Sequence, residues 1–159
     1  MNKNILKNLV IGFLFLVLFS SFKPLDEDSL KWYSWNEGYP IAIKQKKIVL
    51  VDAYTDWCGW CKKMDRDTYT HAEVIKKLNK YFIVVKFNPE LRDLTYNVDS
   101  VTYSARDFFG QLSRGENTGF PTTYFIDPQK KSLMIDPGYH DAAAFLQILD
   151  HVVEDSKKK

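Results

Sequence analysis

Two cysteines three positions apart constrain this chain more than any other feature, because they stand where a predicted strand gives way to a predicted helix. The strand is KIVLVDAYT, residues 47–55, whose β-branched and apolar side chains are typical of a buried central strand. Cys58 and Cys61 follow it, and residues 58–67 are helix formers. They are the only cysteines in the sequence. They therefore form a structural bridge, bind a metal or react.

The remaining segments predict one α/β domain. A chain of 159 residues is the size of a single domain that buries its own core. Residues 29–47 predict a short helix or two, with Gly38 and Pro40 as breaks, and Thr70 with Glu73 forms a capping-box pattern. The other expected elements are a helix over 71–82, a strand over 82–87, a hairpin over 95–103 that turns at Asp99 and Ser100, a helix over 105–115 ended by Gly115, antiparallel strands over 121–127 and 132–136, and a helix over 140–155. This order predicts helices packed around a mixed sheet.

The first 21 residues are laid out like a secretory signal. Lys3 and Lys7 precede an apolar run over 9–19, and Ser20 and Ser21 close it. The run is shorter than the roughly 20 residues of a membrane-spanning helix, which favours cleavage, although its bulky last residues leave an uncleaved anchor as the alternative. We therefore expect a periplasmic or secreted protein, membrane-anchored if the signal is retained, in a setting where cysteine pairs are expected to do disulfide chemistry.

Charge and the chain ends complete the predicted organisation. The sequence has 22 Lys and Arg against 20 Asp and Glu, and the signal holds two of the lysines, so the rest of the chain is close to neutral. This balance gives no indication of a nucleic-acid partner. We expect a polar linker over 22–30, the folded domain over 31–155 and a solvated basic tail over 156–159.

A structural role explains the cysteine pair poorly. A disulfide that closes a loop of four residues contributes only about 2 kcal/mol, against about 3 kcal/mol for a loop of fifteen. A structural zinc ion needs four ligands, and His71, His140 and His151 show no paired spacing that would complete such a site. We therefore expect no metal or other cofactor, and we expect the histidines to be surface or cap residues.

A reactive role fits both the spacing and the position. A cysteine at the start of a helix meets unsatisfied N–H groups, which favour a thiolate. A helix terminus contributes about 0.3 to 2 kcal/mol, enough to lower a thiol pKa from about 8.5 to about 7. Cys61 lies one turn after Cys58 on the same helix face, so its thiol can attack a mixed disulfide formed on Cys58. The pair is therefore predicted to carry out thiol–disulfide exchange.

Over residues 31–153 the chain resembles the thioredoxin family. VDAYTDWCGWCK at 51–62 is similar to the active-site strand and helix of that family, and VVKFN at 84–88 to a second strand. GFPTTYFID at 119–127 is similar to the segment with a cis-proline, and DPGYHDAAAFLQIL at 136–149 to the final turn and helix. The resemblance implies a thioredoxin fold, in which a central mixed sheet is flanked by helices. The stretch before the cis-proline strand is longer than in thioredoxin and accommodates the hairpin and short helix as an insertion.

The resemblance also implies roles for individual residues. Cys58 attacks, Cys61 resolves, and the two alternate between dithiol and disulfide. Asp52 assists the proton transfer at Cys61, with Lys86 beside it; the alternatives are that Asp52 caps local N–H groups and that Lys86 only extends to solvent. Pro121 follows a cis peptide bond and faces the cysteines.

A second group of residues is implied to bind the substrate. Phe120 presents its backbone to a substrate strand, next to Pro121. Trp57, Gly59 and Trp60 complete the surface, and the two tryptophans give it an apolar rim. The alternative for Trp57 is that it packs on the sheet.

The resemblance is strongest to exported thioredoxin-like proteins of bacteria, since Trp60 replaces the proline that thioredoxin carries between its cysteines. It implies an exported thiol–disulfide oxidoreductase that reduces disulfides in extracytoplasmic proteins. Protein thiols and disulfides are then the substrates, a membrane-bound electron donor keeps the protein reduced, and we expect a monomer. The direction of transfer is not set by the sequence. The alternative function is a non-catalytic binding or chaperone module whose disulfide stays oxidised.

Overall fold

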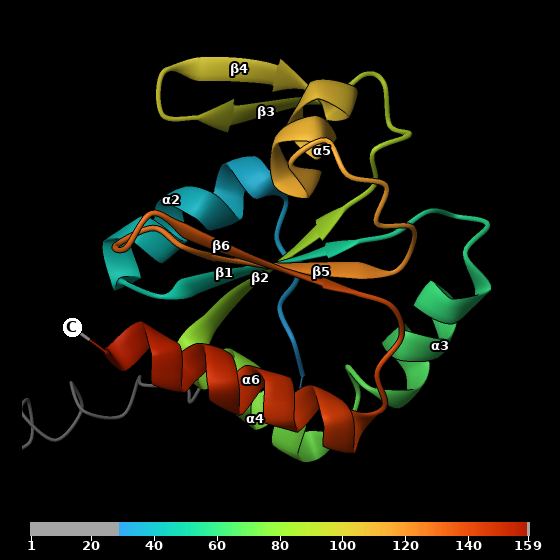
Figure 1. Ribbon diagram of the computed structural model, residues 1–159, viewed down its shortest axis with the longest axis vertical. Helices are drawn as coiled ribbons and strands as arrows, with labels where there is room; N and C mark the ends of the chain where they lie inside the picture. The colour runs from blue at the N-terminus through green and yellow to red at the C-terminus, as the bar shows by residue number, and fades with distance from the viewer. Residues whose placement is uncertain (1–28, 159) are drawn as a thin grey trace, which may run out of the picture.

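The computed structural model describes residues 29–158, so the predicted signal and all but the last two residues of the predicted linker lie outside the described part of the chain. Figure 1 shows a central sheet with helices on both faces. The elements are α2 (Trp35–Gln45), β1 (Ile48–Ala53), α3 (Gly59–Asp67), α4 (Ala72–Tyr81), β2 (Phe82–Phe87), β3 (Thr95–Val98), β4 (Val101–Ser104), α5 (Ala105–Ser113), β5 (Thr122–Asp127), β6 (Ser132–Pro137) and α6 (Ala142–Lys157). No helix within 29–158 is long and apolar enough to cross a membrane.

The main sheet is mixed and has the strand order β2-β1-β5-β6. β1 pairs in parallel with β2, whereas the β1–β5 and β5–β6 pairs are antiparallel. The parallel register sets Asp52 opposite Lys86, and the antiparallel register sets Asp52 opposite Thr123. The segment before α2 adds one parallel bridge, between Tyr33 and Val85 on the outer side of β2. The predicted mixed sheet with flanking helices is confirmed.

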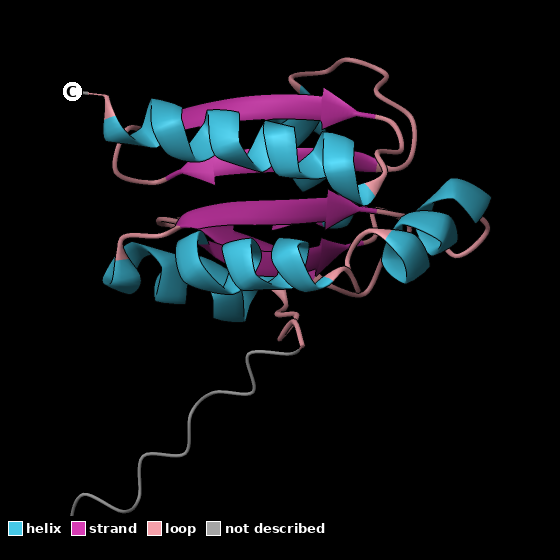
Figure 2. Ribbon diagram, turned by 90° about the horizontal axis from the view of Figure 1, so that it is seen from below, coloured by secondary structure: helices cyan, strands magenta, loops and turns pink. Residues whose placement is uncertain are grey.

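Alternation along β1 divides the interior into two cores. Val49 and Val51 point to one face, which α2, α5 and the β3–β4 hairpin cover. Ile48 and Leu50 point to the other face, where α4 and α6 lie side by side (Figure 2) and Met64 of α3 also packs. Asp52 follows this second alternation, so its carboxylate is directed to the face that carries α3.

The first helix is continuous where a short helix or two, broken at Gly38 and Pro40, were expected. Gly38 and Pro40 both lie inside α2, so the prediction that they interrupt the helix is wrong. The helix begins after Ser34, whose N–H and hydroxyl both donate to the Glu37 carboxylate. Gly38 is buried, and a side chain there would meet Val85 Cγ2 at 2.7 Å. The glycine therefore lets α2 approach the sheet closely.

Two other helix ends differ from the sequence prediction. α4 begins after His71, and the Thr70 hydroxyl donates to the Arg66 carbonyl oxygen, so the predicted capping box is wrong. The Thr70 side chain closes the end of α3 and is not available to α4. α6 continues to Lys157, two residues into the segment expected as a tail.

The insertion before β5 is part of the core. The predicted hairpin is confirmed as β3 and β4, with Asp99 in the left-handed conformation (φ 51°) at its turn. α5 ends at Ser113, and Arg114, also left-handed, caps it one residue before the expected glycine. Tyr96 stacks on Phe108 with ring centroids 4.9 Å apart, and Phe87 of β2 contacts both rings. These contacts fix the insertion against the sheet.

Replacing Gly38 with alanine tests the close packing of α2. The added methyl group would overlap Val85, so we expect the free energy of unfolding to fall by about 1 to 3 kcal/mol in urea denaturation. Gly110 of α5 is the matched control, because no atom lies within 4 Å of a side chain added there, and alanine at that position should add about 0.5 to 1 kcal/mol. Equal effects at the two positions would contradict this assignment of Gly38.

Candidate active site

The two cysteines form a disulfide at the start of α3. Cys58 is the N-cap residue, and the Cα atoms of Cys58 and Cys61 are 5.3 Å apart across the bond. The Cys61 N–H donates to the Cys58 sulfur over 3.1 Å. Only 5% of Cys58 and 3% of Cys61 are exposed. The helix N-terminus thus directs a donor at the sulfur of the first cysteine, and such a donor stabilises a thiolate once the bond is reduced.

Two exposed tryptophans flank the disulfide. Trp57 is 68% exposed and Trp60 58%, which contradicts the alternative that Trp57 packs on the sheet. The Trp57 indole N–H donates to the Glu90 carboxylate at 3.1 Å, and its ring meets the Phe120 ring edge to face. The Trp60 ring lies against Tyr139, with centroids 5.2 Å apart. Large apolar surface is therefore presented around a nearly buried disulfide.

The peptide bond between Phe120 and Pro121 is cis. It lies directly before β5, and the contact between Phe120 and Trp57 places it at the same end of the sheet as Cys58. The Pro121 carbonyl oxygen accepts from the Gly138 N–H at 2.9 Å. The Phe120 ring is also stacked on Phe109 of α5, so the insertion supports this part of the site.

A buried carboxylate lies behind the disulfide. Asp52 is 2% exposed, and one of its oxygens accepts from the Lys86 ammonium. Lys86 also donates to Asp65, which lies four residues after Cys61 on α3. One ammonium thus joins the end of β1 to the active-site helix. Lys86 is a partner of Asp52, so the alternative of a lysine that only extends to solvent is wrong.

The other Asp52 oxygen has no hydrogen-bond partner within residues 29–158. Within these residues no backbone N–H donates to Asp52. The alternative that Asp52 caps local N–H groups is therefore wrong. Two further hydroxyl groups, on Tyr69 and Thr123, are also buried, and Thr123 lies opposite Asp52 in the sheet register. The carboxylate therefore keeps one oxygen free to accept a proton.

Burial raises the pKa of Asp52 above its ordinary value, against the opposing charge of Lys86, and the Asp65 charge adds to the increase. Burial lowers the pKa of Lys86, but Asp52 and Asp65 together outweigh it and the net pKa is raised. The Asp52 carboxyl is almost wholly buried, whereas Lys86 is partly exposed, so burial dominates at Asp52 and favours its neutral form. A buried carboxyl with a raised pKa is a candidate for proton exchange.

Sequence reasoning missed several residues of this site. Three aromatic rings surround the Lys86 ammonium, from Trp32, Tyr54 and Tyr69. Of these residues, only Asp65 could have been predicted from the sequence. It is four places after Cys61, which puts it one turn further along the same helix. The aromatic partners come from distant segments and depend on how the sheet and α3 pack together.

The histidines take no part in this site. His71 is the exposed N-cap of α4, His151 is exposed on α6, and His140 lies 3.0 Å from the Asp136 carboxylate. In the part of the chain that the structure describes, no group of three or more His, Cys, Asp or Glu side chains is placed to hold a metal ion.

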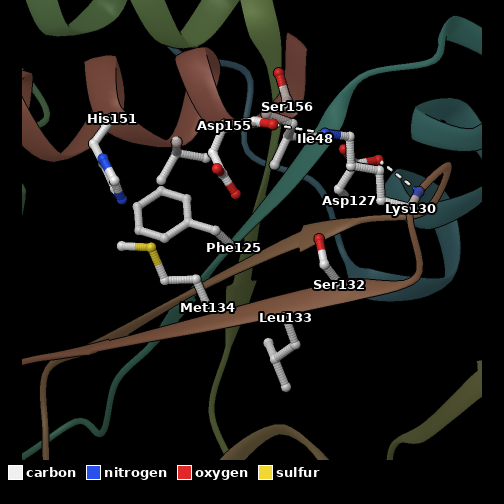
Figure 3. Close-up of a pocket in the computed structure, with 11 residues that line it drawn as sticks. Ile48, Phe125, Asp127, Lys130, Ser132, Leu133, Met134, His151, Asp155 and Ser156 are labelled. Carbon is white, nitrogen blue, oxygen red and sulfur yellow. Dashed lines mark hydrogen bonds between the residues drawn. The ribbon is translucent and has the colours of Figure 1, made fainter. Parts of the chain in front are cut away.

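A pocket of about 140 Å³ lies at the opposite end of the sheet (Figure 3), where Ile48 begins β1. It lies between the β5–β6 turn and the last turns of α6. The Lys130 ammonium donates to the carbonyl oxygens of Asp155 and Lys158 there, both at 2.6 Å. A cation at a helix C-terminus stabilises the helix, so this pocket is a structural feature of the α6 end.

The fold and the site define a class of protein: a thioredoxin-like α/β domain with a Cys-Gly-Trp-Cys disulfide at the first turn of a helix. Residues 21–159 match the family described as "Thioredox_DsbH: Protein of unknown function, DUF255", and the chain belongs to this family.

Curated relatives of similar sequence are thiol–disulfide proteins. The thiol:disulfide interchange protein DsbD of Yersinia pestis is 27% identical over 113 residues, which is 70% of this chain and 17% of that protein. Protein disulfide-isomerase A4 of Bos taurus is 27% identical over 121 residues, 75% of this chain and 16% of that protein. The chain thus spans less than a fifth of the curated relatives it matches.

Solved structures confirm the thioredoxin fold. A thioredoxin from Thermus thermophilus has a TM-score of 0.64 at 20% identity, covering 81% of this chain and 91% of that one. A DsbH oxidoreductase gives 0.57 at 20%, covering 85% and 92%. The reduced C-terminal domain of DsbD from Neisseria meningitidis gives 0.53 at 19%, covering 73% and 91%.

Replacing Asp52 with asparagine should stabilise the protein at neutral pH. A carboxyl with a raised pKa in the folded state favours folding below its unfolded value of about 3.9, and this contribution is lost as the pH rises through the folded pKa. Asparagine does not titrate. The free energy of unfolding at pH 7 should therefore rise by about 1.4 kcal/mol for each unit by which the folded pKa exceeds the unfolded one.

Urea denaturation of the two proteins between pH 4 and 8 measures this difference, which should shrink toward the acid end. Asp56→Asn is the matched control, because Asp56 is exposed in the loop after β1, and its replacement should change the free energy of unfolding by no more than about 0.5 kcal/mol. An Asp52→Asn protein that is less stable than the wild type at pH 7 would show that Lys86 fully compensates the buried charge.

Proposed function

We propose that this protein is an exported thiol–disulfide oxidoreductase that reduces disulfides in extracytoplasmic proteins. The observation that carries the proposal is the Cys58–Cys61 disulfide at the start of α3, backed by a buried carboxylate that is tied to the same helix through Lys86 and Asp65. A disulfide that only stabilised the fold would not need a buried carboxylate such as Asp52 next to it. The class named by the curated relatives, thiol:disulfide interchange, supports the same reading.

The exchange proceeds in two balanced steps. In the first, the Cys58 thiolate attacks one sulfur of a substrate disulfide, the substrate S–S bond breaks, and the departing substrate thiolate takes up a proton. In the second, the Cys61 thiol gives up its proton and its thiolate attacks the Cys58 sulfur, which closes the Cys58–Cys61 bond and releases the second substrate thiol. The protein loses two electrons and the Cys61 proton, and the substrate gains two electrons and two protons, of which water supplies the second.

Asp52 accepts the proton that Cys61 gives up in the second step. Its free oxygen and raised pKa suit a base that works near neutral pH. Lys86 limits how far the pKa rises, so that the carboxylate form remains available to act as the base. Asp65, one turn past Cys61, holds the same ammonium and keeps the base next to α3.

The surface around the disulfide binds the substrate. Trp57, Trp60 and Phe120 offer apolar contact to an unfolded or partly folded chain, and exposed apolar patches of this kind mark interaction sites. Gly59 lies between Cys58 and Trp60, and a side chain added there would meet no atom within 4 Å, so the position is open to a substrate. The backbone of Phe120, before the cis Pro121, pairs with a substrate strand.

The direction of transfer is reduction, with a membrane-bound donor that restores the dithiol. No histidine lies between the cysteines to stabilise the Cys58 thiolate further, and a less stabilised reduced form gives a more reducing pair. The exported location rests on residues 1–21, and the expectation of a monomer stays a prediction. Asp52 and Lys86 are both present, as the resemblance to reducing thioredoxins implies.

The alternative function is a binding or chaperone module whose disulfide stays oxidised. The exposure of Trp57 and Trp60 is the observation that favours it. This module would suppress aggregation of unfolded proteins equally well after both cysteines were replaced with serine.

Cysteine replacements test the proposed exchange. Cys61→Ser should accumulate mixed disulfides with protein thiols, because nothing resolves the bond on Cys58. Cys58→Ser should trap nothing and reduce no insulin, and it is the matched control because it also leaves a single thiol. Non-reducing electrophoresis of the exported protein, with insulin reduction by the purified full chain, measures both. If Cys61→Ser traps no partner and the wild type fails to reduce insulin, the enzyme reading is wrong.

A further inference from the structure

We propose that Trp32, in the segment before α2, is a positioning residue that holds the Lys86 ammonium against Asp52. This inference rests on the proposed function, because the state of Asp52 affects the reaction only if Cys61 gives up a proton during exchange.

The Lys86 ammonium is enclosed by acidic and aromatic groups. It donates to Asp52 and Asp65, and three rings face it: Trp32 at 4.5 Å from the ring centroid, Tyr54 at 5.2 Å and Tyr69 at 5.4 Å. Trp32 is the nearest, and tryptophan gives the strongest attraction of a ring face for a cation. The attraction is larger when the cation is desolvated, and the Lys86 side chain is only 24% exposed.

The segment around Trp32 is aligned with Lys86 by backbone hydrogen bonds. The Tyr33 N–H donates to the Val84 carbonyl oxygen at 3.0 Å, and the Lys86 N–H donates to the Tyr33 carbonyl oxygen at 3.1 Å. The Trp32 ring also meets Tyr69 edge to face, with centroids 5.0 Å apart. Lys86 is therefore bonded through its backbone to the residue after the tryptophan that covers its ammonium.

A cavity of about 360 Å³ adjoins these groups. Leu30, Trp32, Asp65, Tyr69 and Lys86 are among its lining residues. Because Trp32 and Lys86 both line it, removal of the indole would enlarge the cavity at the ammonium and admit water there. Water would then compete with the carboxylates for the ammonium N–H donors.

The loss of Trp32 should therefore act on Asp52 through Lys86. The titratable groups that face the ammonium are Asp52 on β1, Asp65 on α3, and Tyr54 and Tyr69 in the loops after β1 and α3. Asp65 is more exposed than Asp52, so a loosened ammonium would follow Asp65 toward solvent. Asp52 would then lose its cation and become a carboxylate only at higher pH.

The test follows the two thionitrobenzoate releases when the reduced full chain reacts with Ellman's reagent. The first release reports attack by Cys58, and the second, which is independent of reagent concentration, reports resolution by Cys61. In Trp32→Leu the acid limb of the second phase should move up by about half to one pH unit. Trp32→Phe keeps a ring face and should stay close to the wild type, and Trp32→Met serves in place of the leucine variant if that one does not fold.

Lys86→Met provides the background that separates positioning from folding. It should move the acid limb up by itself, and adding Trp32→Leu should move it no further. A Trp32→Leu protein that melts earlier but keeps the wild-type profile would overturn the inference. A shift of the same size on the Lys86→Met background would overturn it too, because Trp32 would then act independently of Lys86.

Carbon NMR titration of the Asp52 carboxyl tests the positioning role without using activity. Trp32→Leu should raise the pKa of Asp52, and an unchanged titration would overturn the inference. If the wild type shows no second release, the proposed function fails, and this titration still decides whether Trp32 positions Lys86.

Discussion

The parallel pairing of β1 with β2 is the constraint on which the rest of the site depends. It sets Asp52 opposite Lys86 on the face of the sheet that carries α3. A carboxylate so deeply buried is costly without a cation, and the ammonium brings in Asp65 as a second partner on the active-site helix. One lysine side chain thereby links the central strand, its neighbour and the helix that begins at the disulfide.

The molecule divides its chemistry between two sides of the disulfide. On the outer side, Trp57, Trp60 and Phe120 offer apolar surface, and the insertion helix supports Phe120 through ring stacking. On the inner side, Asp52 and Lys86 form a polar pair enclosed by aromatic rings. The outer side is suited to holding a substrate chain against Cys58. The inner side is suited to exchanging a proton away from bulk water, where the buried charge keeps its perturbed pKa.

The order of apolar and polar residues predicted those strands and helices whose formation depends on neighbouring residues in the sequence. The strand predicted over 82–87 coincides with β2, because five of its six residues are apolar and buried, a pattern typical of a central strand. The Thr70 cap was predicted wrongly, because its hydroxyl bonds back to α3 and competes with the local motif. Gly38 was read as a break, although it serves a close approach between helix and sheet. Trp32 could not be predicted as a neighbour of Lys86, because only tertiary packing brings them together.

The equilibrium potential of the Cys58–Cys61 pair tests most directly whether this protein reduces its substrates. It is measured against a glutathione buffer, and the Cys58 pKa is measured with it from the absorbance of the thiolate. A reductant with Asp52 behind the pair should have a potential closer to that of thioredoxin, about −270 mV, than to that of the strong oxidant DsbA, about −120 mV. A potential near about −120 mV with a Cys58 pKa below about 5 would contradict it, and the protein would then donate disulfides.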